Sequence, residues 1–290
     1  MLRILSVIFV LLIPCAMQPA AVAGLQKETP RAIISDDFTK ARPQAKKRRN
    51  SAGHSRKSSR TYHPTSTPVA RPAGGFGVDA LQLGLTLWKL QRVGFSNPEN
   101  RRPEVQFLAT RVEADTAFRQ GDLVRISIES PRAGYLYVID RDWFTDGSSG
   151  ETNLIFPVSG DDNRLYPGRL IDIPAEDRKP FRANPKPNQA GELLTIIVTS
   201  SPLPLPISGE PLRVSNGQLL EWSRRWNTFT DRFEMNDGAG QTRTIEERQA
   251  AARKGMRQLM RDDPAPQTIY IMTPSSSEGL LFNLLLSYVQ

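Results

Sequence analysis

The chain has 290 residues, of which 39% are hydrophobic and 23% charged, and its formal net charge is +8. The charge is uneven: residues 25–72 hold 12 Lys and Arg against 3 Asp and Glu, whereas residues 73–290 hold 25 against 27. A folded domain that binds nucleic acid specifically is expected to carry a basic face of its own, so this balance argues against such a function.

The first 23 residues have the layout of a secretory signal peptide. A short charged start at residues 1–3 precedes an apolar run at 4–13, and Ala21-Val22-Ala23 before Gly24 is a small-x-small cleavage pattern. The apolar run is about half of the ~20 residues that a membrane-spanning helix needs. We therefore expect cleavage between Ala23 and Gly24, export to the periplasm or cell surface, and no transmembrane span in the mature chain.

The single cysteine, Cys15, lies upstream of the expected cleavage site, so the mature chain would contain no thiol and no disulfide. The alternative is that Cys15 carries a lipid. Against this alternative, Pro14 stands where a lipoprotein signal has a small residue.

Residues 24–74 are predicted to be a disordered basic linker. The stretch from 40 to 72 is rich in Lys, Arg, Ser, Pro and Thr and contains one aromatic residue, Tyr62, so it has too little apolar surface to offset the entropy of ordering. The linker is expected to be a solvated spacer. Alternatively it contacts anionic lipid or envelope polymer, because each basic residue near an anionic surface contributes roughly 1 kcal/mol.

Residues 75–290 are predicted to form one β-rich domain. Leucines alternate with small or polar residues from Leu81 to Leu87, and the same period of two recurs at 124–128 and, with both faces apolar, at 135–139. Further strands are expected at 105–113, 153–156, 169–173, 192–199, 268–272 and 280–289. Several short strands at such spacing predict a β-sandwich or an open barrel.

Two helices are predicted as an insertion before the last hairpin. Ser215 and Gln218 have the spacing of a capping box, and large apolar residues follow at three- and four-residue steps from Leu219 to Phe233. Thr244 and Glu247 form a second capping box, which predicts a helix that runs to about Met260.

The motifs within this domain resemble a known bacterial family. They are Phe118-Arg119-Gln120-Gly121-Asp122, Gly134-Tyr135-Leu136-Tyr137-Val138-Ile139-Asp140-Arg141, Asp146-Gly147 and Leu154-Ile155-Phe156-Pro157. The pattern resembles the domain of unknown function 4384 over roughly residues 81–288. The resemblance implies an exported or surface-attached module of a kind that also occurs beside kinase or caspase-like domains. It implies no catalytic residue.

The composition of the domain excludes several kinds of catalytic site. His54 and His63 are the only histidines and both lie in the expected linker, so the domain cannot host a Ser-His-Asp triad or the usual zinc site. Glycine-rich phosphate loops are also absent, and we expect no cofactor.

Carboxylates remain as candidate functional groups. Asp140, Asp142 and Asp146 follow the strand at 135–139, and Asp161 and Asp162 come a little later. Two of these groups would suit acid and base catalysis on a glycan. The first three would alternatively hold Ca²⁺, which prefers oxygen ligands. The third interpretation is that these residues only shape turns.

Aromatic residues are candidate binding groups. Trp88 occupies the polar phase of its strand, and Trp143 and Phe144 lie in the acidic loop, so we expect these rings to be exposed. Tyr135 and Tyr137 add large side chains with polar tips in the preceding strand. The alternative is that Trp143 folds back over the strand ends.

Three hypotheses follow from these patterns. The first is a non-catalytic interaction module at the cell envelope, whose partner is a protein or a polysaccharide met by Trp143, Phe144, Tyr135, Tyr137, Asp140, Asp142 and Asp146. The second is a carboxylate-dependent enzyme that acts on a glycan. The third is a purely structural envelope protein.

Overall fold

The structure, a computed structural model, describes residues 30–44, 80–95, 104–208, 212–235, 238–243 and 256–289. The expected signal peptide, with Cys15, Ala23 and Gly24, lies outside the described residues. Most of the expected linker, with His54 and His63, also lies outside them.

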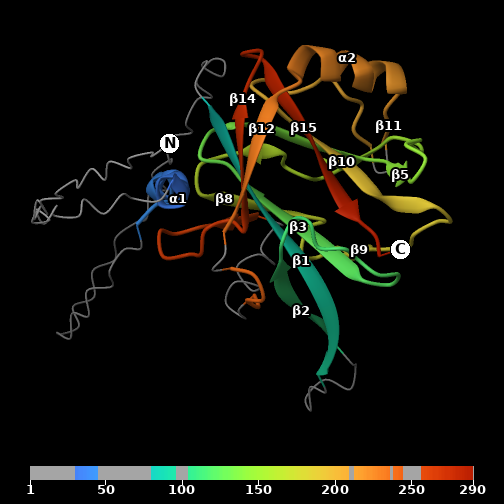
Figure 1. Cartoon of the computed structure of the whole chain (residues 1–290). Helices are drawn as coiled ribbons and strands as arrows, with labels where there is room; N and C mark the ends of the chain where they lie inside the picture. The colour runs from blue at the N-terminus through green and yellow to red at the C-terminus, as the bar shows by residue number, and fades with distance from the viewer. Residues whose placement is uncertain are drawn as a thin grey trace, which may run out of the picture.

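Two antiparallel sheets pack face to face (Figure 1). In the described part of the chain, the first sheet has the strand order β12-β14-β1-β3-β8-β13, with β2 paired to β1 and β9 paired to β3. Its strands are β1 (Leu81–Phe95), β2 (Glu104–Val112), β3 (Leu123–Glu129), β8 (Arg169–Ile173), β9 (Phe181–Arg182), β12 (Phe229–Glu234), β13 (Met256–Gln258) and β14 (Thr268–Thr273).

The second sheet has the order β11-β6-β4-β10-β15, with β5 paired to β10 and β7 paired to β4. Its strands are β4 (Gly134–Asp140), β5 (Asp142–Phe144), β6 (Asn153–Phe156), β7 (Arg164–Leu165), β10 (Gln189–Thr199), β11 (Leu212–Arg213) and β15 (Gly279–Ser287). The predicted β-sandwich is therefore confirmed. The two sheets do not join into a closed barrel.

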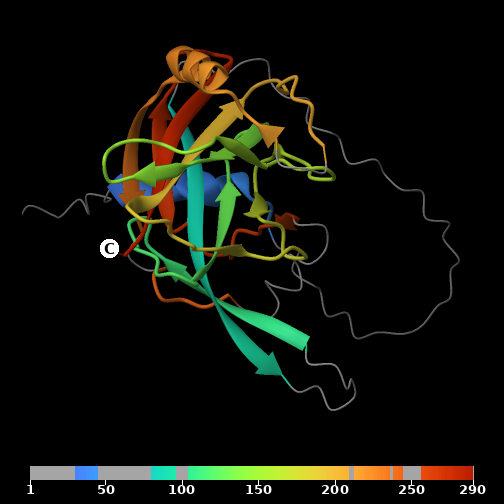
Figure 2. The same ribbon diagram turned by 90° about the vertical axis from the view of Figure 1, so that its right-hand side faces the viewer.

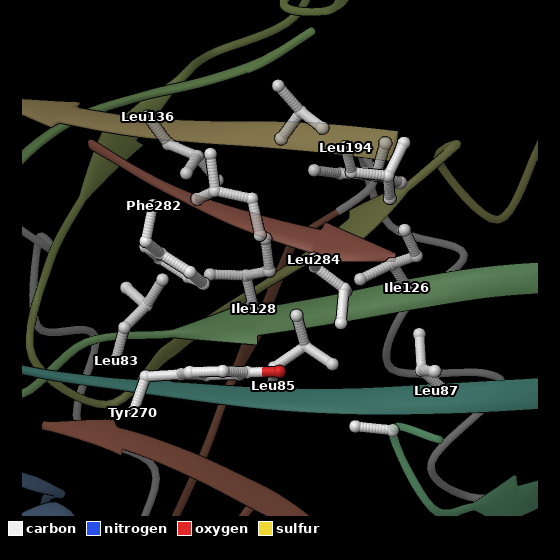
Figure 3. Close-up of a cluster of buried hydrophobic side chains, with 14 of the residues drawn as sticks. Leu83, Leu85, Leu87, Ile126, Ile128, Leu136, Leu194, Tyr270, Phe282 and Leu284 are labelled. Atoms are coloured by element: carbon white, nitrogen blue, oxygen red, sulfur yellow. The ribbon is translucent and has the colours of Figure 1, made fainter. Parts of the chain in front are cut away.

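The core lies between the sheets and follows from the period of two in the sequence (Figure 3). Leu83, Leu85 and Leu87 of β1 meet Leu194 of β10 and Leu284 of β15 in one buried cluster. Each fully buried side chain of this size stabilises the fold by roughly 1.5–3 kcal/mol. Beyond the core, β1 and β2 continue as a long hairpin that projects from the body of the sandwich (Figures 1 and 2).

The helix predicted after Ser215 is confirmed as α2 (Asn216–Trp226), and the Ser215 side chain caps it by accepting a hydrogen bond from the Gln218 N–H. Its predicted extension to Phe229 and Phe233 is wrong, because both residues lie in β12. A spacing of four residues places side chains on one face of a strand as well as of a helix, so it could not distinguish the two.

The predicted end of the second helix, at about Met260, is wrong. Residues 244–255 lie outside the described part, but Met256, Arg257 and Gln258 form strand β13 rather than the last turn of a helix. This strand pairs with β8 at the edge of the first sheet, so pairing with the sheet decides its conformation.

The N-terminal boundary of the folded part also needs correction. Within the expected linker, residues 30–41 form helix α1 (Pro30–Ala41), which lies beside the first sheet (Figure 1). Phe38 is buried against Ile269. The buried Arg42 pairs with Glu129 at 2.6 Å and donates to the carbonyl of Asp263 at 2.6 Å. These contacts attach residues 30–44 to the domain.

A polar layer covers the outer face of the first sheet. Trp88, which the sequence predicted to be exposed, is buried on this face, and its Nε1 donates to Ser127 Oγ at 2.7 Å. The guanidinium carbons of Arg111 and Arg243 lie 5.2 and 5.3 Å from the centre of its ring. The prediction was wrong because Trp88 alternates with the core leucines of β1, and the side of the strand opposite the core was assumed to face solvent.

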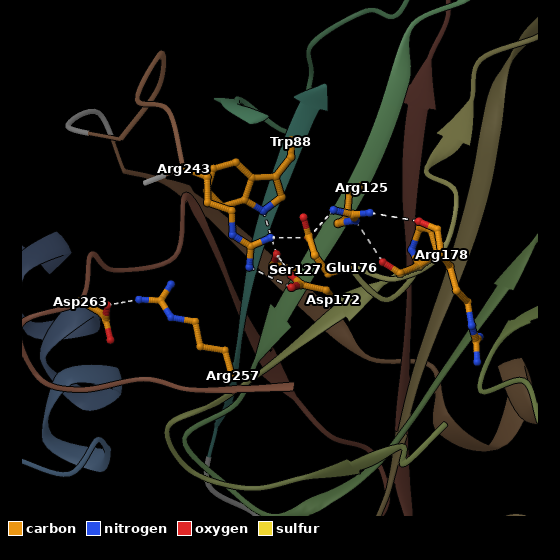
Figure 4. Close-up of polar contacts among 10 residues, drawn as sticks. Trp88, Arg125, Ser127, Asp172, Glu176, Arg178, Arg243, Arg257 and Asp263 are labelled. Atoms are coloured by element: carbon orange, nitrogen blue, oxygen red, sulfur yellow. Dashed lines mark hydrogen bonds and ion pairs between the residues drawn. The ribbon is translucent and has the colours of Figure 1, made fainter. Parts of the chain in front are cut away.

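Ion pairs connect this layer to distant segments (Figure 4). Arg243 pairs with Asp172 at 2.8 Å, and both side chains are 1% exposed. Arg243 also pairs with Glu176, which in turn binds Arg125 of β3. Ser127 completes the network by donating to Asp172 at 2.5 Å.

We predict that Asp172→Asn lowers the free energy of unfolding by about 3 kcal/mol, because Arg243 would keep a buried charge after losing its nearest carboxylate. Asp36→Asn is the control, since Asp36 pairs with Lys40 at the surface and such pairs contribute about 1 kcal/mol or less. Denaturant unfolding of both variants measures the difference, and equal losses would contradict the role given to the buried network.

We also predict that Arg42→Gln destabilises the protein by about 3 kcal/mol, because Glu129 would remain buried without its cation. Lys40→Gln is the control, since Lys40 pairs with Asp36 of the same helix in an exposed position. Denaturant unfolding of the full chain gives both values. An unchanged Arg42→Gln variant would show that residues 30–44 do not stabilise the domain.

Candidate ligand-binding cavity

Three polar residues occupy inward-facing positions at the ends of three core strands. Asp140 lies on the same face of β4 as the core residues Leu136 and Val138, and Glu192 lies on the same face of β10 as Leu194. Tyr288 comes directly after β15 and lies on the face of that strand that carries its core side chains. Since β4, β10 and β15 are neighbours in one sheet, the three side chains meet at the same end of the sandwich.

A cavity of about 130 Å³ lies where these residues meet. Its remaining walls are mostly apolar and come from both sheets, including Phe118, Ile126, Leu194 and Leu286. A cavity of roughly 150 Å³ is enough to hold a benzene molecule. The space therefore suits one small ring or one side chain of a partner.

The carboxyl groups of Asp140 and Glu192 interact directly. Burial raises the pKa of Asp140 to about 7, and the neighbouring charges of Glu192 and Asp142 and a hydrogen bond with Glu192 add to this. The buried Oδ1 of Asp140 receives no hydrogen bond from any donor in the described part. With its pKa raised to about 7, the carboxyl group of Asp140 keeps its proton in acidic solution.

Glu192 is held by two further groups. Tyr288 donates its hydroxyl proton to Oε1 at 2.8 Å, and Gln189 donates from Nε2 to the same oxygen at 3.0 Å. Burial nevertheless raises the pKa of Glu192, and the charge of Asp142 acts in the same direction. Burial and the adjacent carboxylate also raise the pKa of Tyr288, so its hydroxyl stays protonated and remains a donor.

Asp142, which the sequence grouped with Asp140, has a different role. Its carboxylate accepts hydrogen bonds from Lys186 at 2.5 Å and from Gln189 at 2.9 Å. Because Gln189 also binds Glu192, it links the Asp142–Lys186 pair to the carboxyl groups at the cavity.

The other predicted carboxylates act in local structure and do not reach the cavity wall. Asp146 accepts from the Ser148 N–H in an exposed turn, Asp161 accepts from the Val158 N–H, and Asp162 binds Arg164 and Arg169. Within the described residues, no group of three or more acidic, His or Cys side chains is arranged to hold a metal ion. The candidate calcium site at Asp140, Asp142 and Asp146 is thus not supported.

The predicted aromatic contacts are less exposed than the sequence suggested. Tyr137 is buried and its hydroxyl accepts a hydrogen bond from the Leu203 N–H at 2.7 Å, so it fixes the 202–208 segment. Tyr135 packs beside it at the α2 side of the sheet. Trp143 and Phe144 are half-buried, and they form strand β5 on β10 rather than an open loop.

The sequence interpretation found Asp140 but missed its partners Glu192 and Tyr288. The sequence did indicate both residues, because each one is a polar residue on the side of its strand that otherwise carries apolar core residues. That position is costly for a polar group unless it has a partner, which indicates that several such groups meet.

Comparison with known proteins identified no family model, curated protein or solved structure that matches the chain. The resemblance to the domain of unknown function 4384 therefore stays a prediction. As for membrane insertion, neither of the helices in the described part has the length and apolar character to cross a bilayer.

The raised pKa of Asp140 predicts how stability changes with pH. A carboxyl group whose pKa is raised by folding favours the folded state most below its unfolded pKa of about 4, and this contribution is lost as the pH rises to about 7. We predict that Asp140→Asn increases the unfolding free energy at pH 8 by roughly 2–4 kcal/mol relative to the native chain, and that the two converge near pH 4.

Thermal or denaturant unfolding across this pH range measures the effect. Asp177→Asn is the control, because Asp177 is an exposed residue outside the cavity, and it should leave the pH dependence unchanged. A native pH profile with no decline between about pH 4 and 7 would contradict the raised pKa of Asp140.

Proposed function

We propose that the protein is an exported envelope module that binds a partner without catalysing a reaction, and that the cavity at Asp140, Glu192 and Tyr288 receives one projecting group of that partner. The observation that carries the proposal is the combination of apolar walls and converging polar groups in one space of about 130 Å³. Such a combination, with carboxyl groups of raised pKa, is typical of binding sites.

The chemistry of the cavity defines what it accepts. One wall offers carboxyl oxygens and a tyrosine hydroxyl, and the opposite walls offer aliphatic and aromatic carbon. A group with an apolar body and a hydrogen-bond donor at its tip satisfies both. Trp143 and Phe144 lie three and four residues beyond Asp140 in neighbouring β5 and remain half-exposed, so we include them in the proposed contact surface.

A glycan-acting enzyme is the second candidate, and the carboxyl pair is the feature that favours it. Hydrolysis by two carboxyl groups needs one that gives a proton and a second that acts on the sugar or on water. Glu192 accepts hydrogen bonds from Tyr288 and Gln189, and Asp142 is bound to Lys186 and Gln189, so both carboxylates beside Asp140 are already engaged. These contacts favour binding over glycan hydrolysis.

The proposed location rests on the N-terminal sequence. Residues 1–23 have the pattern of a signal peptide, and the basic residues between 40 and 72 would strengthen attachment to an anionic envelope surface. In this proposal the basic residues hold the protein at the envelope, while the cavity selects the partner.

The test compares binding of the purified full chain and of Ala183→Leu to isolated envelope fractions at high salt. Ala183 is a buried residue that lines the cavity, so a leucine there occupies the space a ligand would use. We expect binding to weaken by roughly tenfold or more, as for the loss of a central contact. Trp143→Ala, measured in the same way, should weaken it less.

Ala239→Leu is the matched control, because it adds the same carbon atoms at an exposed position. Binding that is lost in Ala183→Leu, retained in the control and unaccompanied by released product supports the module. Release of glycan product that Asp140→Asn abolishes would replace it with the enzyme. Equal binding by all variants would contradict the role of the cavity, and the absence of both binding and product release would favour a purely structural protein.

A further inference from the structure

Arg182, which lines the cavity described above, also lines a second recess of about 440 Å³. Its walls come from residues 89–92 of β1, where β1 pairs with β2, from the turn before β3, and from β9, which pairs with β3 at Leu123.

The recess is strongly basic. Lys89, Arg92, Arg119 and Arg182 line it, and Asp122 is the carboxylate among its lining residues. Lys89 binds Asp122 at 2.7 Å, and burial of Asp122, which would raise its pKa, is outweighed by this contact and by the Arg119 N–H, so the pKa is lowered. Asp122 is therefore ionised and neutralises Lys89.

The three arginines remain uncompensated. All three are exposed, and within the part of the chain that the structure describes Arg92, Arg119 and Arg182 form no ion pair. The buried arginines Arg125, Arg169, Arg243 and Arg257 differ, since each is bound to a carboxylate. The recess thus gathers positive charge that the described part of the chain does not balance.

The turn that forms the floor of the recess brings one arginine close to the backbone. Gly121 has φ +90°, and Nη2 of Arg182 lies 3.7 Å from the position that a Cβ atom at Gly121 would occupy. The Gly121 N–H and the Ala183 N–H bind carbonyls across this turn, so the backbone there is fixed and Arg119 and Arg182 are held on one side of the domain.

We propose that this recess binds a phosphate group. A guanidinium is planar and offers paired N–H donors that match the oxygens of a phosphate. Three uncompensated arginines also balance a multiply charged oxyanion better than a single carboxylate. The volume is sufficient for a phosphate with a small substituent, as in a lipid headgroup or a soluble phosphate ester.

The proposal is independent of the function assigned to the carboxyl cavity. Arg182 lines both spaces, but the charges of the recess do not require the cavity to hold a ligand. Failure of one proposal therefore leaves the other intact, and Ala183→Leu and the arginine variants below separate them.

The test measures the binding of inorganic pyrophosphate to the full chain by calorimetric titration at physiological ionic strength. Arg119→Gln and Arg182→Gln should each weaken binding by roughly tenfold, the loss expected for a charged hydrogen bond. Arg132→Gln and Arg224→Gln are matched controls, since both residues are exposed and outside the recess and their loss removes the same charge. The controls should change affinity less than about twofold.

Vesicles distinguish the source of the phosphate. Binding to phosphatidylglycerol vesicles but not to phosphatidylcholine vesicles, with the same dependence on Arg119 and Arg182, assigns the site to a lipid headgroup. Competition by pyrophosphate supports a site that also accepts soluble phosphates. Absence of saturable binding to both probes, or equal weakening by the recess and control variants, would overturn the proposal.

Discussion

Strand β3 carries charged and polar side chains on the face that points away from the core, and the fold buries that face too. Arg125, Ser127 and Glu129 alternate with the core residues of the same strand, and all seven residues of β3 are buried. An isolated charge in such a place would cost several kcal/mol, so each needs a partner. The partners come from far along the chain: Glu176 for Arg125, Asp172 for Ser127, and Arg42 for Glu129. These contacts hold the N-terminal helix, the segment after β8 and the segment around residue 243 together in one outer layer.

The inner side of the sandwich could be predicted from the sequence, because burial on one face of a strand leaves a period of two. Leu81 to Leu87, the tyrosine-rich strand β4 and the last strand all follow from it. The outer layer could not be predicted, since an alternating polar residue has the same pattern whether it faces water or a buried partner. Trp88 and Arg125 are examples, and their partners Arg243 and Glu176 lie 155 and 51 residues away in sequence. Helix α1 was hidden by the basic composition around it, although Ile34 and Phe38 have helical spacing.

The candidate site was predicted in part for the same reason. Asp140 stood out because it ends a strongly apolar strand. Glu192 lies in β10, which pairs with β4, and Tyr288 follows β15, which pairs with β10, and the sequence did not reveal this strand order. Once the sheet order is known, the three inward positions fall at one end of neighbouring strands. The basic recess has the same origin. Lys89 and Gln91 lie on the core-facing side of β1, but they come after the last core leucine of that strand. Both cavities therefore lie where a strand continues after the hydrophobic core has ended.

The docking of Arg42 decides where the folded body of the protein begins. Residues 30–44 are held by the sandwich through Phe38 and Arg42, although they lie well before β1 in the sequence. A shortened protein that starts at β1 would lose both side chains and leave Glu129 buried without its cation. The smallest part of the chain that folds stably therefore includes residues 30–44, and trimming the N-terminal region as a dispensable leader would remove part of the domain.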